Sequence, residues 1–357
     1  MTAGDRARGF WAEAWRRYRQ RPLGLAALAF VGFLVLVAVL APAIAGTKPV
    51  VCRYKGRLYA PCLGYFDRRL EPAIFAKDKF RGTYPANLKA KDPDSWAIWP
   101  LFFQDPYRPV RADEWPGRPE NPAKDEGRPS RLNPFGTDQA GVDVLAKMVH
   151  GTTIALLVGF VSMGIAGTIG ILVGAIGGYF GGWIDTVTSR ATEIVMCIPT
   201  LVLILAIIAI LEKPTIWHTM AIIGMTGWTG IARLTRGEFL RLKTAEFVMA
   251  ARAAGAGPGR IMLRHILPNA LAPVLVPITF GIAAAILTES SLSFLGFGPP
   301  PPTASWGSIL NDARSNLTMW WLVVFPGLAI FLTVLAYNLV GEGLQESTDP
   351  RLREARK

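Results

Sequence analysis

The sequence predicts an all-α polytopic membrane protein, and three observations support this fold class. Hydrophobic residues make up 51% of the 357 residues, and the mean hydropathy is +0.31. Several apolar runs reach roughly 20 residues, which is long enough for a helix to cross the hydrocarbon core of a bilayer. Basic residues flank these runs, so the net charge of +12 fits membrane topology better than nucleic-acid binding.

The chain begins with a basic amphipathic segment at residues 1–22, in which aromatic residues recur at helical spacing among arginines. Such a segment is expected to lie in the cytoplasmic interface of the membrane. Residues 23–46 form the first predicted transmembrane helix. A cleaved signal peptide is the alternative, and the retained helix is preferred because the apolar run is longer than the core of a typical signal peptide.

A soluble, extracytoplasmic insert is predicted at residues 47–149. It is rich in proline, charge and aromatic residues, and its charges are mixed in sign. We therefore expect the first two-thirds to be folded and the run from Pro116 to Pro134 to be extended. Runs rich in β-formers flank Lys55-Gly56 and predict a β-hairpin from Val50 to Tyr59, so the insert should be α/β or contain β-structure.

Cys52 and Cys62 lie at either end of the predicted hairpin. If the insert is outside the cytoplasm, a disulfide between them is permitted. The alternative is two unpaired thiols, and the sequence leaves both interpretations open.

A five-helix core is predicted at residues 150–342, followed by a cytoplasmic tail at 343–357. Its spans are expected at residues 154–179, 190–211, 217–234, 268–289 and 319–339. In the second span, Gly170, Gly174 and Gly178 lie four residues apart on one face, which favours close helix packing. Arg190 and Glu193 begin the third span and are expected to pair, because isolated charges there are costly.

The charge distribution predicts the orientation. Six spans place both termini on one side, together with the basic loop at residues 235–268. By the positive-inside rule this side is cytoplasmic. The insert also carries many basic residues, but long loops cross largely regardless of charge.

Within that loop, residues 245–269 combine small residues with arginines. Pro258 lies among three glycines, Gly255, Gly257 and Gly259, and this cluster should separate two short helices. The second of these helices, Ile261 to Leu267, is expected to lead into a span whose first turn contains Pro268.

Several function classes lack their sequence signatures. The chain contains no HExxH motif, no phosphate-binding loop and no CxxC pair, so we expect neither a metal site nor an ATP site on it. A secondary transporter is the rival class, and it would require inverted repeats and ionisable residues at mid-membrane. The predicted spans carry almost no ionisable residues near their centres. An integral-membrane enzyme would require clustered polar residues, and no convincing cluster occurs.

Four segments resemble the dipeptide/oligopeptide permease family of ABC importers, in particular its C-type subunit. They are AARAAGAGPGRIMLRHILPN (250–269), FGTDQAGVDVLAKMVHGTTIAL (135–156), ESSLSFLGFGPPPPTASWGSIL (289–310) and NLVGEGLQESTDPRLR (338–353). The resemblance implies a type I ABC importer permease fold with six transmembrane helices in the bacterial inner membrane. It implies a non-catalytic subunit for peptide import, with nickel chelates, glutathione or glycosides as alternative cargo.

The resemblance also implies partners: a homologous second permease, two cytoplasmic ATP-binding subunits that hold ATP and Mg, and an extracytoplasmic substrate-binding protein. The insert is expected to meet the binding protein or the second permease.

By this resemblance, the 245–269 loop couples the chain to the ATPases, with small side chains that allow close approach to a cleft. The implied coupling residues are Glu246, Phe247, Ala250, Ala251, Arg252, Ala254, Gly255, Arg264 and Pro268. Two positions depart from the family pattern. Met249 stands where a glutamate is usual, which makes Glu246 the candidate acidic anchor, and Val142 stands where an arginine is usual.

Overall fold

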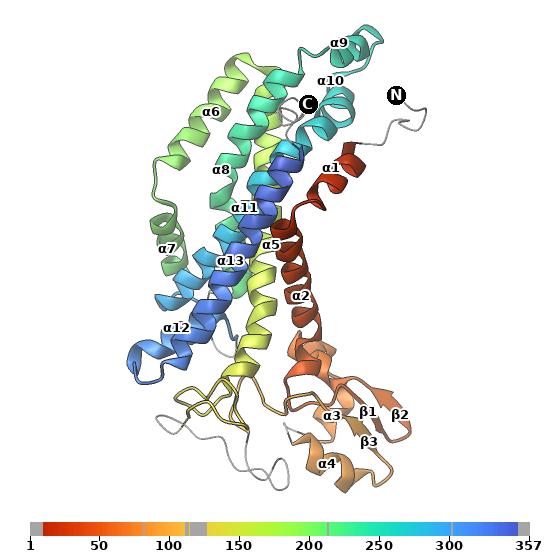
Figure 1. Cartoon of the computed structure of the whole chain (residues 1–357), viewed down its shortest axis with the longest axis vertical. Helices are drawn as coiled ribbons and strands as arrows, with labels where there is room; N and C mark the ends of the chain where they lie inside the picture. Colours follow the sequence, from red (N-terminus) through yellow and green to blue (C-terminus); the bar gives the residue numbers. More distant parts are fainter. Residues whose placement is uncertain are drawn as a thin grey trace. The chain divides into compact units, whose positions relative to one another are not determined.

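The computed structural model describes residues 10–80, 83–110, 114, 127–212, 214–300 and 303–348 of a mostly helical chain (Figure 1). Its longer helices are α1 (Phe10–Tyr18), α2 (Pro22–Ile44), α5 (Val144–Phe180), α6 (Gly182–Met196), α7 (Thr200–Ile210), α8 (Ile216–Leu242), α9 (Glu246–Ala253), α11 (Leu267–Phe294) and α13 (Trp321–Thr348). Short elements are α3 (Ala73–Lys77), α4 (Tyr84–Lys91), α10 (Pro258–Arg260), α12 (Trp306–Asp312) and the strands β1 (Val51–Tyr54), β2 (Arg57–Tyr59) and β3 (Trp96–Ile98).

Among the described residues, four continuous helices are long and apolar enough to cross a membrane, and the bent pair α6–α7 makes a fifth candidate. The four are Pro22–Ile44, Val144–Phe180, Pro258–Phe294 and Trp321–Thr348. The predicted fourth span falls in α8, which has 27 residues and is therefore long enough. It is absent from these candidates because glycine, threonine, tryptophan and His218 make its first 18 residues only weakly apolar, and four charged residues follow in its second half: Arg233, Arg236, Glu238 and Arg241.

The chain divides into two compact units. Unit 1 comprises Met1–Gly32, Leu157–Thr288 and Leu332–Lys357, and unit 2 comprises Phe33–Leu156 and Glu289–Phe331. Unit 1 contains α6 to α10 and the predicted coupling loop. Unit 2 contains the insert and α12.

The glycine row of α5 packs against α8 in unit 1. A Cβ added at Gly174 would lie 2.4 Å from the carbonyl oxygen of Ala232, and one at Gly178 would lie 2.7 Å from that of Arg236. Such distances require backbone-to-backbone contact, which only glycine permits at these positions. The predicted close packing is therefore confirmed, and α8 is the partner.

The predicted third span is not one straight helix. α6 ends at Met196, α7 begins at Thr200, and the two are bent by 81°. Pro199 causes the break, because proline disfavours helical geometry in the residue before it and donates no N–H to the preceding turn. The predicted Arg190–Glu193 pair does form, with 2.6 Å between Nη1 and Oε2, and both side chains are exposed.

The start of α5 also differs from the prediction, because the helix begins at Val144 rather than near residue 154. Asp143 precedes it, and its Oδ1 accepts from the amide of Ala146 at 2.7 Å, which is an N-cap interaction. Polar side chains in the first turns of α5 find hydrogen-bond partners within unit 2. For example, Nε2 of His150 lies 2.8 Å from the carbonyl oxygen of Ala45.

The insert forms a small folded layer in unit 2, with strand order β2-β1-β3 and antiparallel pairing throughout. The predicted hairpin is confirmed. Lys55 and Gly56 form its turn with φ of 48° and 76°, the left-handed pair that a type I′ turn requires. Tyr54, Phe75, Phe80 and other buried aromatic side chains pack between the sheet and the helices α3 and α4. The third strand, β3, was not predicted. Most of the run from Pro116 to Pro134 lies outside the described residues.

Cys52 and Cys62 are both free and buried, so the structure does not contain the disulfide that their spacing permitted. The thiol of Cys62 instead donates to the carbonyl oxygen of Val50 at 3.4 Å. Burial raises the pKa of Cys52 to about 11, with a smaller contribution from the nearby Cys62.

Candidate functional site

The candidate site is the segment that joins α8 to α11, which the resemblance assigns to coupling. α8 ends at Leu242, and the chain turns immediately, with the amide of Ala245 donating to the carbonyl of Leu242 at 3.0 Å. Lys243 fixes this turn to the end of α5, since its Nζ donates to the carbonyl of Gly178 at 3.2 Å. α9 therefore begins from a point tied to two long helices.

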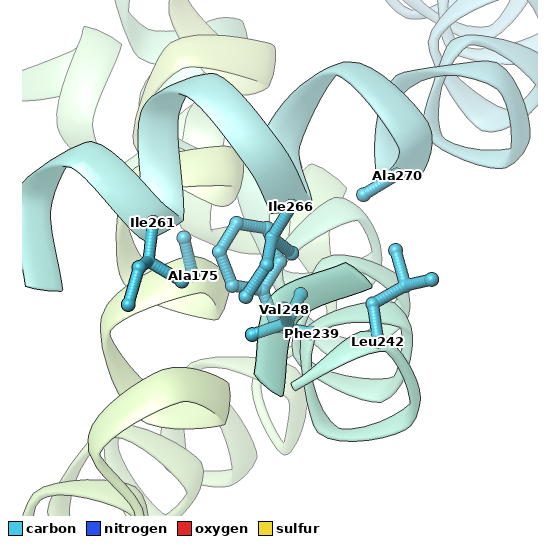
Figure 2. Close-up of a cluster of buried hydrophobic side chains, with 7 residues drawn as sticks. All are labelled: Ala175, Phe239, Leu242, Val248, Ile261, Ile266 and Ala270. Atoms are coloured by element: carbon cyan, nitrogen blue, oxygen red, sulfur yellow. The ribbon is translucent and has the colours of Figure 1, made fainter. Parts of the chain in front are cut away.

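α9 is an eight-residue helix with one anchored face. Of its described side chains, Val248 alone is buried, and it is 0% exposed. Figure 2 shows Val248 beside Phe239 of α8 and Ile266 at the base of α11, in a cluster of buried apolar side chains. Ala251, one turn later on the same face, is half-buried. An isolated helix of this length is not stable in water, so this contact holds it.

The other faces of α9 are open. Glu246, Phe247, Ala250, Arg252 and Ala254 are all exposed, although Phe247 is a large aromatic side chain that is 42% exposed. Two residues were missed as members of this surface: Ala253, which is exposed, and Met249, which is 53% exposed. A helix turns by about 100° per residue, so both residues lie well away from the buried face of Val248, and this spacing could have identified them.

Gly255 ends α9. Its φ is +82°, and its amide donates to the carbonyl of Arg252 at 3.0 Å, which is a glycine C-cap. No atom lies within 4 Å of the position that a Cβ on Gly255 would occupy, so glycine is needed for the backbone conformation and not for space. The predicted helix break is confirmed here.

The second short helix was predicted wrongly, because Pro258–Phe294 forms one continuous helix instead. Ile261–Ile266 is a π-helical turn within it. The turn accommodates Pro268, which lacks an N–H and would clash with the carbonyl four residues earlier in a regular α-helix. Arg264 and Pro268 are exposed on this helix, and Leu263 is 67% exposed.

The base of α6 is fixed to α8 by an ion pair. Nη2 of Arg236 donates to Oδ2 of Asp185 at 2.7 Å, and its Nε donates to Oδ1. The two bonds make a bidentate contact, the geometry that arginine favours with carboxylates. This ion pair joins α6 to α8, and the glycine contacts join α5 to α8, so the helices to which α9 is attached are held to one another.

The arrangement is a short exposed helix that is held at one buried face. Among the described residues, no group of three His, Cys, Asp or Glu side chains could hold a metal ion. α9 instead presents a short, small-faced helix with apolar and charged side chains at its margin, fixed to the long helices at one face. Such an element can transmit a push between a partner and the helices beneath it.

Two family models match parts of this chain. The model for binding-protein-dependent transport system inner membrane components matches residues 168–354, and the model for the N-terminal TM domain of oligopeptide transport permease C matches residues 9–59. A peptide permease protein of Brucella suis biovar 1 is 42% identical over 226 residues, which cover 62% of this chain and 74% of the relative. The dipeptide transport system permease protein of Alkalihalophilus pseudofirmus is 39% identical over 234 residues, which cover 65% of this chain and 77% of that relative. Among solved structures, one chain of an amino acid ABC transporter matches with a TM-score of 0.43 and 16% identity, covering 60% of this chain and 95% of that chain.

Proposed function

This chain belongs to the family of binding-protein-dependent transport system inner membrane components, and from that premise we propose that it is the permease subunit of an ATP-driven importer of di- or oligopeptides. The observation that carries the coupling mechanism is α9, an exposed small-faced helix anchored by one buried side chain. Partner ATPases bind this helix, and its movement is passed to α8 and α11.

The proposal assigns roles to the residues of α9. Ala250, Ala253 and Ala254 let the helix approach a cleft closely because they project little beyond the backbone. Phe247 and Met249 supply exposed apolar area at the margin. Glu246 and Arg252 provide charges at the two ends of the helix, where polar contacts with a partner are accessible. Arg264 lies in the π-helical turn and Pro268 in the first turn of α11, so both pass the displacement along this continuous helix.

The full transporter in this proposal has several other chains. A homologous second permease completes the path, and two cytoplasmic ATPases bind ATP and Mg²⁺. A substrate-binding protein delivers the peptide from the opposite side of the bacterial inner membrane. Both termini of this chain and α9 face the cytoplasm. The 235–268 loop is rich in basic residues, and by the positive-inside rule such loops lie on the cytoplasmic side. Peptide cargo is supported by the names of the relatives, which are peptide and dipeptide permeases.

Ala250→Glu tests the docking surface. The side chain is exposed, so the fold tolerates the change, while the added bulk and charge block close approach. Peptide uptake into proteoliposomes that contain all partner subunits should fall to background, and the chain should still insert. Ala76→Glu, on an exposed position of the insert helix α3, is the matched control and should transport normally. Normal uptake by Ala250→Glu would contradict the docking role of α9.

Cargo is tested separately. The substrate-binding protein should be purified from native cells, and the ligand that it carries should be identified by mass spectrometry. A peptide ligand agrees with the proposal, whereas a metal chelate or a sugar contradicts the peptide assignment and leaves the coupling mechanism intact.

A further inference from the structure

The insert sheet has an apolar face that its own core does not cover. Alternation along β1 points Cys52 and Tyr54 into the core, so Val51 and Arg53 point to the other face. Arg53 lies opposite Leu58 on β2 and Trp96 on β3, which places the three side chains in one row across the sheet.

The apolar members of this face are strongly exposed. Leu58 is 65% exposed, Trp96 is 45% exposed, and Ile98, which lies opposite Val51, is 56% exposed. We call the set of Val51, Arg53, Leu58, Trp96 and Ile98 the outer sheet face.

The outer sheet face leads directly to a membrane-spanning helix. After β3 the chain runs along the last turn of α2, where the amide of Leu101 donates to the carbonyl of Ala43 at 3.1 Å and that of Phe102 to the carbonyl of Ile44 at 2.8 Å. Leu101 is 77% exposed. Val39, on the last turns of α2, is 63% exposed, as expected for a span in contact with lipid. Exposed apolar side chains therefore continue from the span, through Leu101, to the sheet.

The composition of this face suits a membrane interface. Tryptophan is enriched where the acyl chains meet the headgroups, because its ring is apolar and its N–H remains hydrated. Leu58 and Ile98 add apolar surface to bury. Arg53 can extend its charged head toward lipid phosphates while its stem stays among these apolar side chains.

The size of the face argues against a protein partner as its occupant. Three strands of three or four residues cover about 13 Å by about 14 Å, which is roughly 200 Å². A stable protein interface needs about 800 Å² from each partner. Contact with a bilayer does not need so large an area, because the spanning helix α2 already holds the chain in the membrane.

We propose that the outer sheet face is a membrane anchor, which lies at the boundary between headgroups and acyl chains in the leaflet where α2 ends. The anchor holds the insert flat against the bilayer beside its own span. The proposal requires only that the chain is inserted in a membrane, so its test does not depend on whether the chain imports peptides.

The test uses variants of the full chain with one accessible cysteine, in nanodiscs of phosphatidylethanolamine and phosphatidylglycerol. Cys197 is exposed and is first replaced by serine, whereas the two insert thiols are buried. An environment-sensitive fluorophore is attached to Ile98→Cys and, as the matched control, to Ala76→Cys. Ala76 is exposed on α3, the helix that packs on the opposite side of the sheet.

Phosphatidylcholine with a spin label near the top of its acyl chain should quench the label at position 98 several-fold more than the label at position 76. Iodide in the buffer should show the opposite order. Two outcomes overturn the proposal. Equal lipid quenching at both positions, with position 98 open to iodide, means that the face is hydrated. Protection of position 98 from both quenchers in the assembled transporter means that a protein covers it. Leu58→Cys, on the opposite edge strand β2, repeats the measurement if the Ile98 variant does not insert.

Discussion

Val248→Ala isolates the attachment of α9 from its docking surface. Val248 is fully buried against α8 and the base of α11, and it points away from the exposed faces of α9. Truncation removes two methyl groups, which costs about 2 kcal/mol, between the cost of one methyl group and that of a whole leucine side chain. This corresponds to roughly a 30-fold increase in the population of detached α9, since about 1.4 kcal/mol equals a factor of ten.

Hydrogen exchange measures this effect directly. Amides of residues 249–254 should exchange roughly 30-fold faster in the variant, because α9 has no other buried side chain among those described. Amides in the middle of α8 should keep their rates. Peptide uptake should fall while the partner ATPases still hydrolyse ATP, because a loosely attached helix transmits little displacement.

Val323→Ala is the control. It makes the same truncation on α13, where Val323 is 44% exposed, and it should alter neither exchange nor uptake. Faster exchange of α9 in Val248→Ala combined with fully normal uptake would refute the argument that coupling depends on a rigidly attached α9.

Two further predictions concern packing and thiol chemistry. Gly174→Val should prevent folding, because a Cβ there would lie 2.4 Å from a carbonyl oxygen of α8; Gly164→Val, which meets nothing within 4 Å, should give normal yields of monodisperse protein in size-exclusion chromatography. A thiol reagent at pH 8 should label only Cys197 in the native chain, because Cys52 and Cys62 are buried and Cys52 stays protonated below its pKa of about 11. All three thiols should react in denaturant without reductant, and a count of one would show a disulfide instead.

Local chemistry made part of the fold predictable from the sequence. The Lys55-Gly56 turn followed from a short polar pair between β-forming runs, and the left-handed conformations of both residues bear this out. The glycine row of α5 likewise predicted close packing, because no other residue leaves room for a second backbone. Both features depend on a few adjacent or regularly spaced residues.

Helix continuity was harder to predict. The apolar run resumes directly after Pro199, so hydropathy hides the bend of 81° between α6 and α7. The opposite error occurred at Pro268, where the sequence predicted a boundary between a short helix at Ile261–Leu267 and the next span, and a π-helical turn at Ile261–Ile266 maintains continuity instead. In both places the tertiary arrangement decides whether a proline ends a helix or is accommodated within it.

The docking surface was predicted by residue size, whereas the structure selects residues by helix face. Ala251 was grouped with Ala250 and Ala254 because all three are small, yet it lies on the side of Val248 and is half-buried. Ala253 and Met249 lie on the open side. Sequence periodicity contains this information, but the inward face is identified only once the position of Val248 in the cluster is known.

Crosslinking from α9 tests the central claim most directly. Phe247 is 42% exposed and can be replaced by a photoreactive benzoyl-phenylalanine of similar shape, with the same replacement at Leu328 on α13, 52% exposed, as the control. In the assembled transporter, position 247 should crosslink to an ATPase subunit, and position 328 should not. A complex that imports peptide while position 247 forms no crosslink to an ATPase would contradict the account.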